Sequence, residues 1–162
     1  VGIVSREIND KGLELQEFFE DKIELVVPAS HRWAGRSFVE PSEIIREPML
    51  IREETSGTRG VMLSELSKFD ISLDDLNIFM EIGSAEGIME AVSNGCGVSF
   101  VSELASKHLR DLGRAVNVPL RGVNIKRLTY MARKRISAPH RPRDVFWSFI
   151  HAPENADLLK RR

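Results

Sequence analysis

The segment MLIREETSGTR, residues 49–59, passes from a short apolar strand through a polar loop rich in Ser, Thr and Gly into the start of a helix. Residues 80–86 repeat this order, with the loop at Gly83 and Ser84. Strand–loop–helix units of this kind build α/β sheets, and their loops lie at the carboxyl ends of the strands, where such sheets bind ligands. The two segments therefore predict an α/β domain with a ligand site at these loops.

The rest of the chain continues the alternation of strands and helices. Short apolar or β-branched runs predict strands, and apolar residues at helical spacing predict helices. This alternation indicates a parallel or mixed sheet of βαβ units. The expected strands cover residues 1–4, 23–27, 49–51, 77–82, 98–101 and 125–132, and helices are expected after residue 59 and over residues 84–94, 103–112 and 143–150.

Composition and charge limit the function classes. The 162 residues are 42% hydrophobic and 29% charged, which is typical of an ordinary globular chain of one or two domains and unlike a disordered or coiled-coil chain. The formal net charge of -1 gives no global reason to bind nucleic acid or an anionic membrane. No apolar run approaches the roughly 18 residues of a transmembrane helix. The single cysteine fits a reducing compartment.

The two loops offer a specific chemistry. A helix amino terminus carries unpaired N–H groups and a partial positive charge, so it attracts carboxylate, sulfate or phosphate groups. The hydroxyls of Ser56, Thr58 and Ser84 could orient such an anion. The alternative is that these residues only cap their helices, since Ser and Thr are favoured N-caps. Arg59 could pair with a ligand carboxylate, although a solvated helix surface is the expected place for it.

Other sites find little support in the sequence. Residues 55–59 lack the Gly-Lys-Ser/Thr ending of a P-loop, and residues 83–87 lack the glycine spacing of a dinucleotide fingerprint. The four scattered His form no metal motif, and no nucleophile with its partners can be assigned. Cys96 is expected to be a small buried hydrophobe. Residues 121–143 carry eight Lys and Arg and no acid, which could touch nucleic acid but is expected to form a solvated strand face.

Five motifs occur in a characteristic order. They are VGIV at residues 1–4, IELVVPASHRWA at 23–34, PMLIREETSGTR at 48–59, EIGSAEGIMEAV at 81–92 and NGCGVSFVS at 94–102. Each motif alone is weak, but together, with this spacing, they closely resemble the effector-binding domain of LysR-type transcriptional regulators. The resemblance extends to about residue 150.

The resemblance implies an α/β, two-lobed periplasmic-binding-protein-like (type 2) fold. Residues 1–28 and 135–162 would belong to the first lobe, and residues 29–134 would form the second. The first strand here is similar to the third strand of the family's first lobe, so that lobe is expected to be incomplete. The winged helix-turn-helix DNA-binding domain of the family is expected to be absent from this chain.

The resemblance also implies a function. A small, anionic effector would bind between the lobes and alter a homodimer or homotetramer, and DNA would be bound only through the absent domain. The protein would be bacterial and cytoplasmic, with no cofactor, metal, membrane contact or enzymatic activity. The implied effector-binding residues are Ser5, Thr55, Ser56, Thr58, Ser84, Glu86, Ser99 and Val101.

Two other classes remain open at this point. A solute-binding protein that serves transport shares the two-lobed fold, and a signal peptide upstream would favour it. An enzyme on the same architecture is disfavoured, because the sequence shows no nucleophile, metal or acid–base constellation.

Overall fold

The computed structural model describes residues 1–5, 7–135 and 141–155. It divides into two compact units, one of Val1–Glu20 with Leu128–Arg162 and one of Asp21–Arg127. The backbone passes between the units within the strands β2 (Leu13–Pro28) and β7 (Ile125–Lys134). The sequence placed these crossings near residues 28 and 134, and the assignment of the chain to two lobes stays a prediction.

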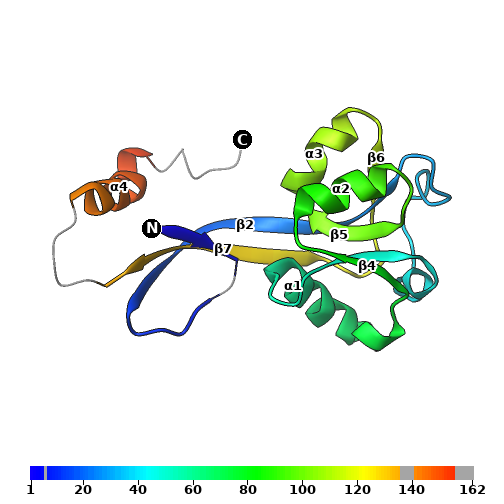
Figure 1. Cartoon of the computed structure of the whole chain (residues 1–162), viewed down its shortest axis with the longest axis horizontal. Helices are drawn as coiled ribbons and strands as arrows, with labels where there is room; N and C mark the ends of the chain where they lie inside the picture. Colours follow the sequence, from blue (N-terminus) through cyan, green and yellow to red (C-terminus); the bar gives the residue numbers. More distant parts are fainter. Residues whose placement is uncertain (6, 136–140, 156–162) are drawn as a thin grey trace. The chain divides into compact units, whose positions relative to one another are not determined.

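The Asp21–Arg127 unit is built on a mixed sheet in which the order of neighbouring strands is β2-β5-β3-β4 (Figure 1). The strands β3 (Met49–Arg52), β4 (Ile78–Ile82) and β5 (Val98–Ser102) run parallel. On the side of β5 away from β3, the strand β2 pairs antiparallel with β5, and β2 also pairs antiparallel with β6 (Ala115–Val118). The mixed sheet predicted from the sequence is therefore confirmed.

Both faces of this sheet are covered. The helix α1 (Gly57–Leu66) lies on one face, and α2 (Ala85–Ser93) and α3 (Glu103–Asp111) lie on the other (Figure 1). Successive strand residues point to opposite faces, so Met49 and Ile51 join one apolar core while Leu50 joins the other. This explains why β3 and β5 are almost continuously buried.

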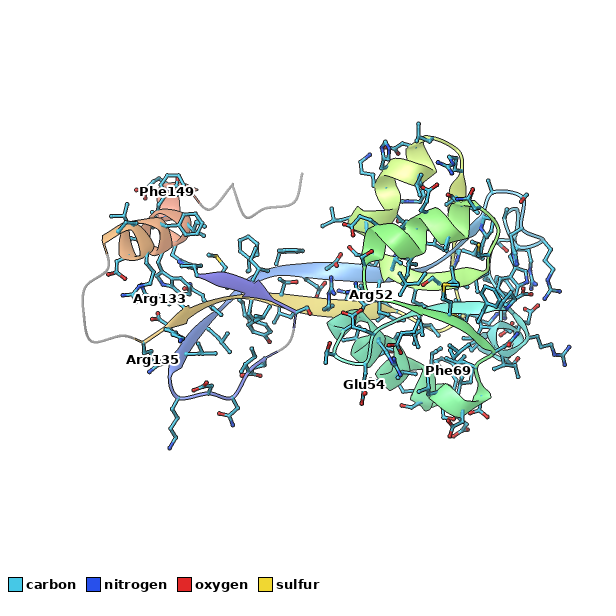
Figure 2. The ribbon with its side chains drawn as sticks, in the orientation of Figure 1. Arg52, Glu54, Phe69, Arg133, Arg135 and Phe149 are labelled. Atoms are coloured by element: carbon cyan, nitrogen blue, oxygen red, sulfur yellow. The ribbon has the colours of Figure 1, made fainter. Side chains whose placement is uncertain are left out.

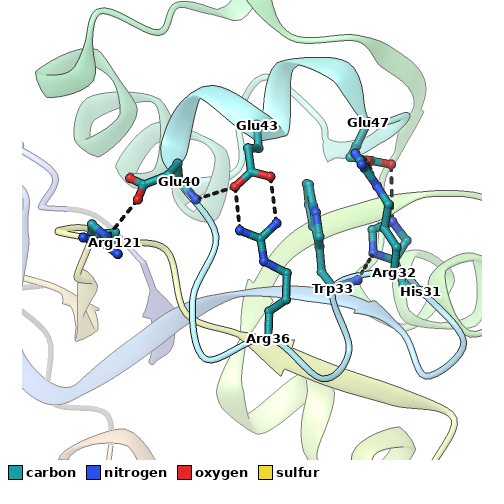
Figure 3. A network of polar contacts seen from close by, with 8 residues as sticks. All are labelled: His31, Arg32, Trp33, Arg36, Glu40, Glu43, Glu47 and Arg121. Carbon is teal, nitrogen blue, oxygen red and sulfur yellow. Dashed lines mark hydrogen bonds and ion pairs between the residues drawn. The ribbon is translucent and has the colours of Figure 1, made fainter.

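Short 3₁₀ turns connect these elements: η1 (Pro41–Arg46), η2 (Ser67–Phe69) and η3 (Leu73–Asp75). Ion pairs surround η1 (Figure 3): Arg36 binds Glu43 at 2.7 Å, and Arg121 binds Glu40 at 2.8 Å. Trp33 is buried beside this network. The sequence placed Phe69 on the apolar face of the first helix, but α1 ends at Leu66 and Phe69 is 37% exposed.

The turn before β5 differs from its sequence interpretation. Cys96 is exposed, so the expectation that it is buried is wrong. Cys96 lies in the turn between α2, which ends at Ser93, and β5, which begins at Val98; Gly95 has φ +81° there, and residues 94–96 are the exposed part of the turn. Gly97 is buried in the same turn, with its backbone against the carbonyl oxygen of Pro48.

The other unit contains β1 (Gly2–Val4), which pairs antiparallel with β7, the helix α4 (Arg141–His151) and the turn η4 (Pro153–Asn155). Trp147 is the buried aromatic residue of α4, and Arg133 stacks on its ring 4.4 Å from the centroid. The sequence expected Val145, Phe146, Phe149 and Ile150 to form the packed face. Instead Val145, Phe146 and Phe149 are exposed (Phe149 is labelled in Figure 2).

One strand was not predicted from the sequence, and another is longer than expected. β6 was not predicted, because Ala115-Val116-Asn117-Val118 is a short run in which only two residues are fully buried. β2 is one strand of 16 residues, where the sequence indicated a strand of five residues after a loosely alternating stretch. In the described part of the chain, no helix is long and apolar enough to cross a membrane.

Candidate functional site

A small pocket lies where the parallel strands of the Asp21–Arg127 unit end. Arg52 is the last residue of β3 and Ser102 the last of β5, and both line the pocket. Thr58 of α1 and Ala85, the first residue of α2, bring two helix starts to the same place. The pocket has a volume of about 60 Å³ and is completed by Phe100, Val101 and Arg127. It therefore occupies the position that the strand–loop–helix segments predicted.

Arg127 organises the polar side of this pocket. Its guanidinium donates a hydrogen bond to the Thr58 hydroxyl at 2.8 Å and pairs with the Asp21 carboxylate at 2.6 Å. Asp21 is only 1% exposed and also accepts a hydrogen bond from the Ser102 hydroxyl at 2.9 Å. The Nε of Arg127 is buried and has no hydrogen-bond partner within the described residues. The Nε–H of Arg127 is thus an unsatisfied donor of this network.

Two further guanidinium groups lie close to this network. Arg52, at the end of β3 (Figure 2), pairs with Glu53 at 2.7 Å and lowers the pKa of that carboxyl through the hydrogen bond. Arg59 pairs with Glu81 at 2.7 Å and donates to the Arg52 carbonyl at 3.1 Å. The Arg59 side chain is 12% exposed, so the expectation that it lies on a solvated helix surface is wrong. Each of these cations already has a carboxylate partner.

The predicted hydroxyl residues have different surroundings. Thr58 lines the pocket, and Ser56 is buried at the N-cap of α1 without a side-chain capping bond. Ser84 caps α2 by accepting a hydrogen bond from the Gly87 N–H at 3.0 Å. Ser99 is buried and donates to the Leu50 carbonyl at 2.7 Å. The capping role considered for Ser84 is therefore present in the structure.

The remaining predicted residues are spread more widely. Val101 is buried and lines the pocket. Thr55 and Glu86 are exposed and are not among the residues that line it. Ser5 is half-buried in the other unit. The structure thus brings Thr58 and Val101 together, and the assignment of all eight residues to effector binding stays a prediction.

The sequence interpretation missed several lining residues, above all Arg127. Arg127 belongs to the basic stretch that was expected to be solvated, but its side chain is 17% exposed and its partners are 106 and 69 positions away in the chain. Ser102 directly follows the predicted strand 98–101, and its place at the strand end was the available signal. Arg52 had the same signal after the strand 49–51. No group of three or more His, Cys, Asp or Glu among the described residues could hold a metal ion.

Comparison with known proteins adds the family context. The model of the LysR substrate binding domain matches residues 1–153. An uncharacterised HTH-type transcriptional regulator of Methanocaldococcus jannaschii is 34% identical over 145 residues, which are 88% of this chain and 48% of that protein. The HTH-type transcriptional regulator CysL of Bacillus subtilis is 26% identical over 162 residues, 99% of this chain and 52% of CysL. The chain spans about half the length of these curated relatives.

Solved structures agree with this fold. The CcmR regulatory domain of Synechocystis in complex with 2-PG has a TM-score of 0.76 at 23% identity, over 93% of this chain and 71% of that chain. The effector binding domain of QuiR in complex with shikimate has a TM-score of 0.76 at 17% identity, over 91% of this chain and 68% of that chain. At such identities the likeness establishes the fold alone. The expected α/β, periplasmic-binding-protein-like type 2 fold is confirmed.

Proposed function

The chain belongs to the LysR substrate-binding domain family of transcriptional regulators, and we propose that it is the part of such a regulator that senses a small-molecule effector. The relatives compared above are transcriptional regulators and not enzymes, as expected from the sequence. The alternative of a solute-binding protein for transport is not supported by these relatives.

The effector carries an anionic group that binds in the Arg127 pocket. The hydrogen-bonded group of Arg127, Thr58, Asp21 and Ser102 is the observation that carries this proposal. The guanidinium groups of Arg52 and Arg127, the Thr58 hydroxyl and the amino terminus of α2 all favour a negatively charged oxygen. The ligand shikimate of the QuiR domain is a carboxylate, which is the same chemistry.

Thermal unfolding of the 162-residue chain tests the proposal. A panel of carboxylates and phosphates, starting with 2-PG and shikimate, would be added at increasing concentration. A ligand at about 100 times its dissociation constant stabilises the folded state by roughly 2.7 kcal/mol, which gives a clear rise in the unfolding temperature. If no anion on the panel raises it, the proposed ligand class is wrong.

A pair of variants assigns the effect to this pocket. Thr58→Val removes the hydroxyl that lies on Arg127, and we expect it to weaken binding of the anion by about tenfold, since a hydrogen bond to a charged group contributes 1.5–3 kcal/mol. Ser93→Ala is the matched control, because its hydroxyl binds the Glu90 carbonyl at the other end of α2. Equal affinity of both variants and the unchanged chain would place the ligand elsewhere.

For the whole protein we propose a cytoplasmic homo-oligomer in which ligand binding shifts the population of DNA-binding arrangements. DNA contact would come from a helix-turn-helix domain outside these 162 residues, as the names of the relatives suggest. The edge strand β4 supports contact between copies, because Ile78, Phe79 and Met80 are all exposed on it.

A further inference from the structure

A second, larger pocket lies elsewhere in the Asp21–Arg127 unit. Its volume is about 120 Å³, twice that of the Arg127 pocket. It lies along β2, which pairs with β6 from Leu25 to Pro28 and is also a neighbour of β7, so the pocket occurs where one edge of β2 changes partner. Phe100 is the residue that the two linings share.

The polar side of the second pocket contains a buried acceptor without a donor. The side-chain N–H of Asn117 donates to the Glu24 carboxylate. Because a carboxylate can only accept, this bond fixes the amide so that Oδ1 faces away from Glu24. Asn117 Oδ1 is buried and has no hydrogen-bond partner within the described residues. A buried acceptor of this kind costs stability unless something donates to it.

The second pocket contains a charged pair, in which the negative side chain is less exposed than the positive one. Lys22 lines the same pocket and its ammonium pairs with Glu24, but the Lys22 side chain is 51% exposed and the Glu24 side chain only 16%, so the carboxylate is the less exposed of the two charges. The carboxylate has further lone pairs to offer after it accepts from Lys22 and Asn117. Glu24 and Asn117 Oδ1 together therefore favour a ligand that donates hydrogen bonds and carries positive charge.

The remaining wall is apolar. Phe100, Val118 and Ile125 are at most 3% exposed, and Val123 is partly buried against the same core. An apolar cavity of about 150 Å³ is known to accept a benzene-sized molecule, so the volume here suits a body of about four to six carbon atoms.

We propose that this second pocket binds a small primary amine, with its ammonium group on Asn117 Oδ1 and the Glu24 carboxylate. The carbon body packs against Phe100, Val123 and Ile125. This site differs chemically from the Arg127 pocket, whose lining contains the guanidinium groups of Arg52 and Arg127. The domain would thus respond to two ligands of opposite charge.

The test is a titration of the 162-residue chain with cyclohexylamine, followed by amide chemical shifts in NMR spectra. Saturable shifts are the expected result at Glu24, at Asn117 and at Asn124, which also lines the pocket. Cyclohexanol, which has the same ring and no charge, should bind at least about tenfold more weakly, because a hydrogen bond to a charged group contributes more than one between neutral groups.

Variants separate a built site from general adhesion of the amine. Glu24→Gln keeps an acceptor but removes the charge, and we expect it to weaken cyclohexylamine binding by about tenfold while leaving cyclohexanol unchanged. Asn117→Leu removes the free acceptor and should weaken both ligands. Asn77→Leu is the matched control, because Asn77 is exposed and does not line the pocket.

Two outcomes would overturn the proposal. The first is the absence of saturable shifts at Glu24 and Asn117, which would mean that the pocket does not bind the amine. The second is binding that neither Glu24→Gln nor Asn117→Leu weakens. If Asn117→Leu does not fold, which its amide spectrum would reveal, Glu24→Gln with the two ligands still decides the question.

Discussion

Arg127 connects three segments that are far apart in the sequence, and its removal should be costly. We expect Arg127→Met to lower the free energy of unfolding by about 3 kcal/mol, because it leaves the Asp21 carboxylate buried and without its cation. Urea unfolding of the chain measures this change. Lys107→Met is the control: its ion pair with Asp111 is exposed, so the expected loss is below about 1 kcal/mol.

The cause of that loss can be isolated. In the double variant with Asp21→Asn and Arg127→Met, no charge is left buried, so we expect it to be more stable than Arg127→Met alone. The Ser102 hydroxyl can still donate to the amide oxygen at position 21. If the double variant is as unstable as the single one, the stranded charge of Asp21 is not the reason.

Glu43 gives a prediction for pH. Two hydrogen bonds from Arg36 and one from the backbone N–H of Glu40 lower the pKa of Glu43 from 4.5 to about 2 (Figure 3). Since the folded-state pKa is depressed, the stabilisation is complete above about 4.5 and is lost as the pH falls towards 2. An NMR titration that follows the carboxyl carbon of Glu43 measures this pKa as its midpoint. Arg36→Gln should return the midpoint towards 4.5, and a native midpoint already near 4.5 would contradict the prediction.

At the scale of single residues, the sequence predicted part of the site. Thr58 follows from local rules, because a hydroxyl at a helix start is visible in the chain order, whereas Val101 was implied only by the family resemblance. Arg127 does not follow from such rules. Its role depends on contacts with Asp21 and Thr58, and nothing in the basic residues around it distinguishes a buried, paired cation from a solvated one.

The parallel pairing of β3 with β5 depends on one close approach at Gly97. A Cβ at this position would lie 2.3 Å from the backbone carbonyl oxygen of Pro48, and Val98 N–H donates to that same oxygen at 2.9 Å. Gly97→Ala should therefore displace the start of β5 and destabilise the chain by about 2 kcal/mol. Thermal or urea unfolding measures the change.

Gly60→Ala is the opposite case and a matched control. Gly60 lies inside α1, is exposed, and has no atom within 4 Å of the place where a Cβ would stand. Alanine is the better helix former, so the variant should be more stable by about 0.5–1 kcal/mol. Loss of stability in both variants would mean that a general intolerance of Cβ atoms, and not the contact at Pro48, explains Gly97.

Most elements of the Asp21–Arg127 unit could be predicted from the sequence, since their apolar runs are short and clearly bounded. α4 shows the limit of periodicity. Its apolar residues Val145, Phe146 and Phe149 form an apparent packing face, yet Trp147 is the buried residue, because it meets Arg133 of β7. Such a contact between distant segments is absent from the local pattern.

The oligomer proposed for the whole molecule can be tested at β4. This strand pairs with β3 and exposes Phe79 by 58% and Met80 by 46%. We expect Phe79→Lys to convert the oligomer to a monomer, because a cation on an apolar edge opposes pairing of strands between copies. Light scattering during size-exclusion chromatography of the 162-residue chain gives the mass directly.

Leu112→Lys is the control for that experiment. Leu112 is 57% exposed at the end of α3, so the same substitution is made at an apolar surface residue away from β4. It should leave the mass unchanged. A chain that is monomeric before any substitution, or an oligomer that survives Phe79→Lys, would show that β4 is not the contact.

The exposed turn at Cys96 makes the molecule easy to label. Cys96 is the chain's only cysteine, and its backbone N–H binds the Ala91 carbonyl near the end of α2. A maleimide fluorophore would therefore attach at one known position without any engineered thiol. Ala85, at the other end of α2, lines the Arg127 pocket. A compound that displaces α2 when it binds there would therefore change the environment of the dye and so its fluorescence emission.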